Sequence, residues 1–136
     1  MGIKIIASCN CGAIQFKSTE NPILQVCCHC TDCRKATKND FSNIVFFKGK
    51  FVSVIGKLTG HEYIAESQNK TSRESCLNCG DIMFDKSEGF PGLIGVFEPR
   101  LKMPFVAQTN CHVWVKSKLP HIMVPATSKQ YVKGII

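Results

Sequence analysis

Short stretches of alternating apolar and polar residues recur along this chain and predict a fold built mainly from β-strands. Residues 13–17, Ala-Ile-Gln-Phe-Lys, show the two-residue period of a half-buried strand. Glycines such as Gly56 and Gly60 separate these stretches. We expect strands at residues 3–8, 13–17, 23–28, 44–47, 51–55, 61–65, 93–97 and 111–115, with residues 73–75 leading into the motif at 76–80 and residues 82–84 leaving it.

One short helix, residues 32–37, is expected among the strands, with Thr31 or Asp32 as its N-cap. The sequence Cys9-Asn10-Cys11-Gly12 is expected to turn the first two strands into a hairpin, because glycine adopts positive φ angles that other residues resist. The segment after Pro120 is expected to be irregular. The fold class is therefore mainly β with one short helix, in a single domain spanning residues 1–136.

Nine cysteines in 136 residues far exceed average usage. The N-terminal apolar run is too short for a secretory signal, and no segment approaches the roughly 18 apolar residues of a membrane span. We therefore expect a cytoplasmic protein without membrane contact, in which the cysteines serve metal or redox chemistry rather than disulfides.

The formal net charge of +7 raises the question of a nucleic-acid partner. The lysines are scattered rather than clustered, and thiolates bound to two zinc ions would lower the net charge to about +4. The charge therefore gives mild support for small anionic ligands and makes nucleic acid an unlikely partner. It does not specify an oligomeric state.

Two cysteine motifs with matching glycines, Cys9-x-Cys11-Gly12 and Cys76-x-x-Cys79-Gly80, have the form of two halves of one metal site. Together they offer four sulfurs, which is the complete coordination of a structural zinc. A disulfide or buried free thiols are the alternatives, and spacing does not distinguish zinc from an iron–sulfur cluster. We predict a structural zinc held by Cys9, Cys11, Cys76 and Cys79.

A second cysteine set lies in residues 27–35, Cys-Cys-His-Cys-Thr-Asp-Cys-Arg-Lys. Strand alternation places Cys28 and Cys30 on one face, and a turn after Cys30 would bring Cys33 beside them. Three thiolates with an open fourth position are typical of a reactive zinc site. The neighbouring cations Arg34 and Lys35 favour the thiolate form. We predict that the catalytic, zinc-binding thiols are Cys28, Cys30 and Cys33.

A closed version of this site would take a fourth ligand from a set of nearby or distant donors: Cys27, His29, Cys111 and His112. A redox-reactive thiol cluster without metal is a further alternative. Outside a metal site, Cys27 and Cys111 are interpreted as small buried residues and Trp114 as part of the core. Two histidines are expected at the surface, His61 and His121. Three acidic residues are candidate acids or bases: Asp81, Asp85 and Glu98. Simple exposure to solvent would explain these residues equally well.

The order of four motifs resembles the glutathione-dependent formaldehyde-activating enzyme / centromere protein V family. The motifs are Cys9-x-Cys11-Gly12, Cys28-His29-Cys30-x-x-Cys33-Arg34, Cys76-x-x-Cys79-Gly80 and His112-Val113-Trp114-Val115. The resemblance runs from about Ile5 to Leu119 and implies a β-tent fold of several small twisted antiparallel sheets around a structural zinc. It also implies two zinc ions per chain, a structural one on the four-cysteine set and a reactive one on Cys28, Cys30 and Cys33. The family activity adds glutathione to formaldehyde, in the carbon–sulfur lyase class.

Three segments depart from the family pattern. Lys38 stands where glycine is usual, Gly95-Val96-Phe97-Glu98 replaces Gly-Thr-Leu-Asp, and Leu119-Pro120-His121 replaces a segment that often ends in tryptophan. Both cysteine sets remain intact, so the departures bear on the substrate rather than on the fold.

Three functions are consistent with these observations. The first is a zinc-dependent lyase that adds a thiol such as glutathione to formaldehyde or a related small carbonyl compound, with Arg34 or Lys35 contacting a glutathione carboxylate. The second is a non-catalytic, zinc-stapled binding module, and the third is a glutathione carrier that binds without turnover.

Overall fold

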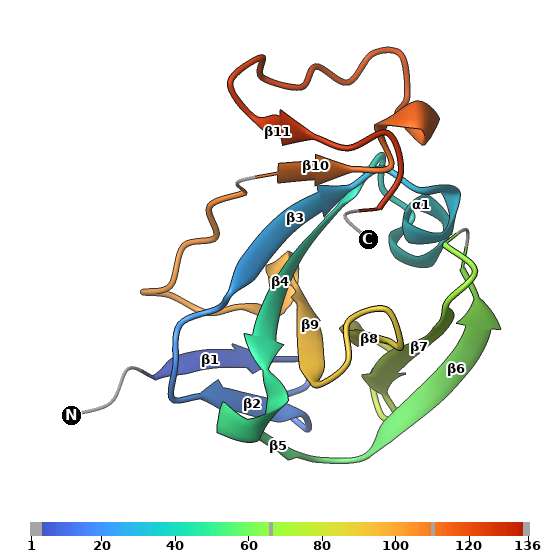
Figure 1. Ribbon diagram of the computed structural model, residues 1–136. Helices are drawn as coiled ribbons and strands as arrows, with labels where there is room; N and C mark the ends of the chain where they lie inside the picture. Colours follow the sequence, from blue (N-terminus) through green and yellow to red (C-terminus); the bar gives the residue numbers. More distant parts are fainter. Residues whose placement is uncertain (1–3, 66, 110, 135–136) are drawn as a thin grey trace.

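The computed structural model describes residues 4–65, 67–109 and 111–134, and this part of the chain is mainly β, as expected (Figure 1). A small sheet has the strand order β1-β2-β5, and a large sheet has the order β11-β10-β3-β4-β9-β8-β7-β6. The small sheet contains β1 (Ile5–Ser8), β2 (Gln15–Ser18) and β5 (Val52–Ile55). The large sheet contains β3 (Leu24–Cys28), β4 (Ser42–Lys48), β6 (Leu58–Ile64), β7 (Lys70–Cys76), β8 (Ile82–Ser87), β9 (Leu93–Phe97), β10 (Cys111–Val113) and β11 (Lys129–Gln130). The helical elements are α1 (Thr31–Thr37), η1 (Gly49–Phe51), η2 (Glu98–Arg100) and η3 (Val115–Ser117).

The expected strands are present, with differences of extent and of direction, and residue 3 of the first expected strand lies outside the described residues. The strand expected at 111–115 ends at Val113, because Trp114 adopts a left-handed φ of 59° and starts the 3-10 turn η3. β7 already begins at Lys70, and β11 has too few residues to show any periodicity. β10 runs parallel to β3 and β11, so the large sheet is mixed rather than purely antiparallel.

The hairpin between β1 and β2 is confirmed. The amide of Gly12 donates to the carbonyl of Cys9 at 3.1 Å, and Gly12 has the positive φ of 78° that the turn requires. The expected N-cap of α1 is wrong. Cys30 caps the helix instead, because its sulfur lies 3.3 Å from the amide of Cys33 and accepts its hydrogen bond.

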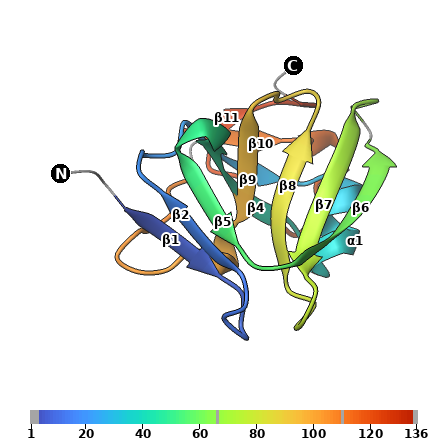
Figure 2. The same cartoon turned by 90° about the horizontal axis from the view of Figure 1, so that it is seen from below.

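Two clusters of buried side chains hold the sheets together. The first includes the tilted rings of Phe16, Phe47 and Phe84, and it joins the small sheet to the centre of the large one. Figure 2 shows the small sheet beside β9 and β8, with β5 leading into β6 at the far edge. The second cluster packs Phe46, Phe97 and Trp114 around the thiols of β3 and α1. Within the described residues, none of the helical segments has the length and apolar character of a membrane span.

Candidate metal and thiol sites

The four cysteines of the two glycine-containing motifs meet at one point. Their sulfurs lie within 4.8 Å of one another, with Cys9–Cys11 at 3.5 Å and Cys11–Cys76 at 3.7 Å. Zinc with Zn–S bonds near 2.3 Å requires sulfurs about 3.8 Å apart at the corners of a tetrahedron, so these thiols fit zinc. All nine cysteines are free, which rules out the disulfide alternative in this structure.

This four-cysteine cluster ties the β1–β2 turn to the β7–β8 turn. The amide of Ile14 donates to the sulfur of Cys9 at 3.3 Å. The amide of Cys79 donates to the sulfur of Cys76 at 3.4 Å. Asp81 accepts from the amide of Asn10 at 2.7 Å and pairs with Arg100. Asp81, one of the candidate acids, therefore supports the hairpin next to this cluster.

Cys28, Cys30 and Cys33 form the second cluster, as the spacing predicts. The end of β3 supplies Cys28, the following turn supplies Cys30, and the first turn of α1 brings Cys33 back within 4.8 Å of both. The sulfurs of Cys28 and Cys30 are 3.2 Å apart, and all three side chains are buried. Hydrogen bonds from Cys28 and Cys33 lower the pKa of Cys30 to about 3, while the hydrogen bond to Cys30 raises the pKa of Cys28. The set therefore favours one thiolate held by two thiols.

A buried arginine that the sequence interpretation missed reaches this cluster. Arg73 donates through Nη2 to the sulfur of Cys33 at 3.2 Å and through Nε to Asp85 at 2.7 Å. Both charged side chains are buried, with exposed fractions of 8% for Arg73 and 10% for Asp85. Burial raises the pKa of Asp85, and the adjacent Arg73 opposes that rise. The only available signal was an arginine within the polar stretch Lys-Thr-Ser-Arg-Glu-Ser at 70–75.

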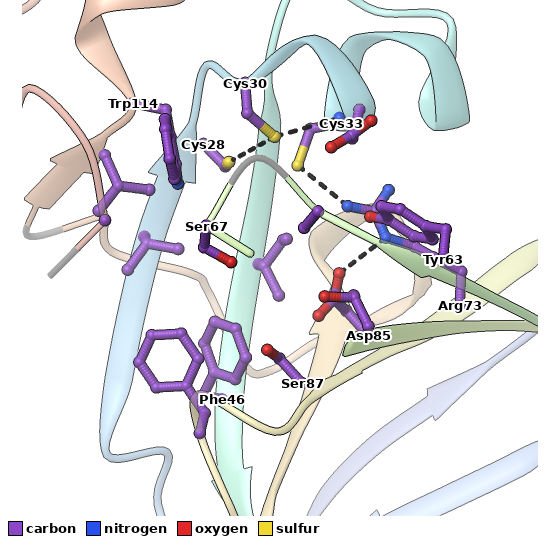
Figure 3. Close-up of a pocket in the computed structure, with 18 residues that line it drawn as sticks. Cys28, Cys30, Cys33, Phe46, Tyr63, Ser67, Arg73, Asp85, Ser87 and Trp114 are labelled. Atoms are coloured by element: carbon purple, nitrogen blue, oxygen red, sulfur yellow. Dashed lines mark hydrogen bonds and ion pairs between the residues drawn. The ribbon is translucent and has the colours of Figure 1, made fainter. Parts of the chain in front are cut away.

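A cavity of about 100 Å³ opens beside the three thiols (Figure 3). Its polar wall holds Tyr63, Arg73 and Asp85. Its remaining wall is largely apolar and includes Trp114, which is thus both a core residue and part of the cavity lining. The arrangement places three thiols and a guanidinium in the wall of one small, mainly apolar space.

The two basic residues predicted to contact glutathione lie outside this cavity. Arg34 donates through Nη1 to the carbonyls of His29 and Ser117. Its guanidinium therefore links these two backbone segments. Lys35 lines an adjoining groove of about 490 Å³, whose wall also contains Tyr63 and Arg73. Contact between Lys35 and a substrate carboxylate stays a prediction, which this location supports.

Comparison with known proteins settles the family. The model of the glutathione-dependent formaldehyde-activating enzyme family matches residues 4–117. The chain belongs to this family. A search of curated proteins gave no match. Among solved structures, a crystal structure of a Rhodobacter sphaeroides protein is similar with a TM-score of 0.58 and 17% identity, over 74% of this chain and 90% of that chain. That likeness supports the fold of this glutathione-dependent formaldehyde-activating enzyme family member.

The donors considered as a fourth ligand are not placed at the three-cysteine cluster. Cys27, His29 and His112 instead meet one another on the opposite face of β3. Cys111 is a buried thiol whose sulfur lies 3.9 Å from the carbonyl of Gln25. His61 is exposed and stacks on Tyr63.

The remaining candidate groups of this family member lie at the surface or outside the site. His121 is exposed, as expected, and pairs with Asp40 at 2.8 Å. Glu98 lies in η2, away from the residues that line the thiol cavity. Lys38, the departure from the family glycine, ends α1 with a left-handed φ of 57°, the conformation that glycine adopts most easily.

Proposed function

We propose that this chain is a zinc-dependent enzyme of the carbon–sulfur lyase type, which adds a thiol such as glutathione to formaldehyde or a related small carbonyl compound. The observation that carries the proposal is the position of Cys28, Cys30 and Cys33 in the wall of a small cavity that also contains Arg73. Family membership supports glutathione-dependent formaldehyde activation in general. We place the chain in a reducing compartment such as the cytoplasm, because a dense cysteine pattern of this kind favours metal or redox chemistry.

The sizes of the two adjoining spaces support a division of the substrates. The thiol cavity of about 100 Å³ is smaller than the roughly 300 Å³ of typical sites for drug-sized ligands. It holds the reacting sulfur and a small aldehyde, but not a whole tripeptide. The groove of about 490 Å³ shares Tyr63 and Arg73 with the cavity and contains Lys35. We assign the peptide part of glutathione to this groove, with Lys35 facing a carboxylate.

The residues of this chain supply charge stabilisation for the addition. Zinc held by Cys28, Cys30 and Cys33 would keep the substrate thiol as a thiolate at neutral pH. The thiolate sulfur forms a bond to the carbonyl carbon, and the electron pair of the C=O π bond moves to the oxygen. The Arg73 side chain lines the cavity, and its Nη1 is a buried nitrogen without a partner among the described residues. We therefore assign to this guanidinium the stabilisation of the negative oxygen. The proton lost by the thiol is recovered at that oxygen, which gives the hydroxymethyl thioether.

The test is the rate of exchange between free formaldehyde and S-hydroxymethylglutathione, measured by NMR at equilibrium, because the uncatalysed addition also occurs. Zinc-loaded wild type is expected to accelerate exchange. Cys30→Ser is expected to lose the acceleration, and Cys111→Ser, which changes a buried thiol outside all three clusters, should retain it. Glutathione binding without acceleration would instead indicate a carrier. Absence of both binding and acceleration would leave a non-catalytic, zinc-stapled module.

A further inference from the structure

A third set of metal-binding side chains lies on the face of β3 opposite the thiol cavity. Cys27 alternates with Cys28 in β3, so its side chain leaves the strand on the other side. His29 follows the last residue of β3, and its amide donates to the carbonyl of Val113 at 3.1 Å. His112 joins them from β10, where it is the register partner of Cys27 in the parallel pairing with β3. Three donors, from β3, from the residue that follows it and from β10, therefore meet at one place.

Their separations match those of ligands around one ion. The sulfur of Cys27 is 3.5 Å from Nε2 of His29, which in turn is 3.0 Å from Nδ1 of His112, and all three atoms lie within 4.8 Å of one another. Tetrahedral zinc with ordinary bond lengths requires about 3.5 Å between sulfur and nitrogen and about 3.3 Å between two nitrogens. Cys27 and His29 are buried and His112 is partly exposed, so a metal has access from the His112 side.

Hydrogen bonds alone satisfy the three donor atoms less well than a metal ion would. Nε2 of His29 faces both Cys27 and His112, yet it either donates one hydrogen or accepts through one lone pair. A cation accepts a lone pair from all three donors at once. Nδ1 of His29 is buried without a partner among the described residues, so no neighbour on that side fixes the tautomer of the ring in advance.

We propose that Cys27, His29 and His112 form a third metal site, which binds zinc through one thiolate and two imidazoles and leaves a fourth position open. One thiolate and two neutral imidazoles are ligands suited to zinc. The site joins β10 to β3 and is independent of the proposed lyase function. Its chemical distinction from the other two clusters is that only this one contains histidine.

The first test is the zinc content of protein saturated with zinc and freed of excess metal. Wild type is expected to hold one equivalent more than His112→Phe and one more than Cys27→Ser. Cys111→Ser is the matched control, because it removes a buried thiol of the same strand pair and should keep the wild-type content. The measured quantity is the difference of one zinc equivalent between wild type and variant. An empty three-cysteine site would lower the zinc content of both proteins equally and would leave this difference unchanged.

The second test needs no variant. Long-range proton–nitrogen NMR of the histidine rings, with and without zinc, is expected to show metal-bound shifts at Nε2 of His29 and Nδ1 of His112. His61 and His121 serve as internal controls, since they lie outside the cluster. Unchanged ring-nitrogen shifts on zinc addition, or a zinc content that does not fall in folded His112→Phe, would overturn the proposal and leave a hydrogen-bonded strand contact. If His112→Phe does not fold, the wild-type NMR result decides alone.

Discussion

Arg73 and Asp85 are direct register partners in β7 and β8, and their side chains form a buried ion pair at 2.7 Å. The same guanidinium reaches the sulfur of Cys33 at 3.2 Å and lies over the rings of Tyr63 and Phe97. Strand pairing therefore sets the direction in which the guanidinium fork points, with Asp85 on one side and the thiols on the other.

Replacing Arg73 by lysine tests whether the fork, rather than the charge, supports catalysis. A lysine ammonium lacks the planar geometry that joins Asp85 and Cys33 simultaneously. Because a hydrogen bond to a charged group contributes about 1.5–3 kcal/mol, we expect Arg73→Lys to slow the exchange reaction roughly tenfold to hundredfold. The measurement is exchange NMR, with Arg100→Lys as the control at an ion pair outside the cavity. Equal rates for wild type and Arg73→Lys would contradict this role.

Arg73 and Asp85 are also expected to depend strongly on each other in their contributions to the free energy of unfolding. Arg73→Met leaves Asp85 buried without its partner and should lower the free energy of unfolding by about 3–5 kcal/mol. The double variant Arg73→Met/Asp85→Leu removes both charges and should recover most of that loss. Urea denaturation of the two single variants and the double variant gives the coupling. Additive losses would show that the two side chains act independently.

Gly95 is predicted to be intolerant of even a methyl group. A Cβ at this position in β9 would lie 2.8 Å from side-chain carbons of both Ile44 and Phe46 and 3.1 Å from the carbonyl of Asp85. Gly95→Ala should therefore cost about 1–3 kcal/mol in the free energy of unfolding. Gly60→Ala is the matched strand control, because its Cβ would meet only the hydroxyl of Ser72 at 3.9 Å. Similar unfolding midpoints for the two variants would refute this prediction.

Lys38 offers a stabilising substitution. Its left-handed φ of 57° costs a residue with a Cβ roughly 1–2 kcal/mol, part of which glycine loses again through its larger unfolded-state entropy. We expect Lys38→Gly to raise the free energy of unfolding by up to about 1 kcal/mol. Lys35→Gly, in the helical backbone three residues earlier, should instead lower it. Thermal unfolding of both variants, compared with wild type, measures whether the two changes in the free energy of unfolding have opposite signs.

Removal of metal from the four-cysteine cluster is expected to loosen the contact between the two turns. Cys11 and Cys79 are exposed members of this cluster, so their substitution leaves little of the core disturbed. Cys79→Ser should lose one zinc equivalent and several kcal/mol of stability, because metal binding and folding are coupled. Elemental analysis and thermal unfolding measure the two effects, again with Cys111→Ser as control. Full zinc content in Cys79→Ser would show that the cluster is not closed by this thiol.

Both cysteine clusters were predictable, the three-cysteine cluster from its local spacing and the four-cysteine cluster from two matching half-site motifs that lie far apart in sequence. In Cys28-x-Cys30-x-x-Cys33, a strand end and one helical turn suffice to bring the sulfurs together. The four-cysteine cluster requires only that two glycine-containing turns meet. The sequence pattern also identified most strands, since each has an alternating or apolar run of its own.

The partners of the thiols were not predictable because they depend on long-range register. Arg73 reaches Cys33 across 40 positions in sequence, and nothing near Arg73 indicates which strand will lie beside it. The meeting of His29 with His112 depends on β10 running parallel to β3, a direction that neither segment encodes locally. Cys30 as N-cap was missed because the expected caps carry an oxygen acceptor rather than sulfur.

The sulfur of Cys30 belongs to two structures at once, since it faces the cavity and holds the first turn of α1. A covalent bond formed at this atom by an aldehyde or an oxidant weakens the acceptor on which the amide of Cys33 depends. We expect the first turn of the helix to fray as a result, and Cys33 to move away from Arg73. Modification of one sulfur atom would therefore change the backbone structure of the helix. Faster protease cleavage or faster amide hydrogen exchange at residues 31–34 would detect this change.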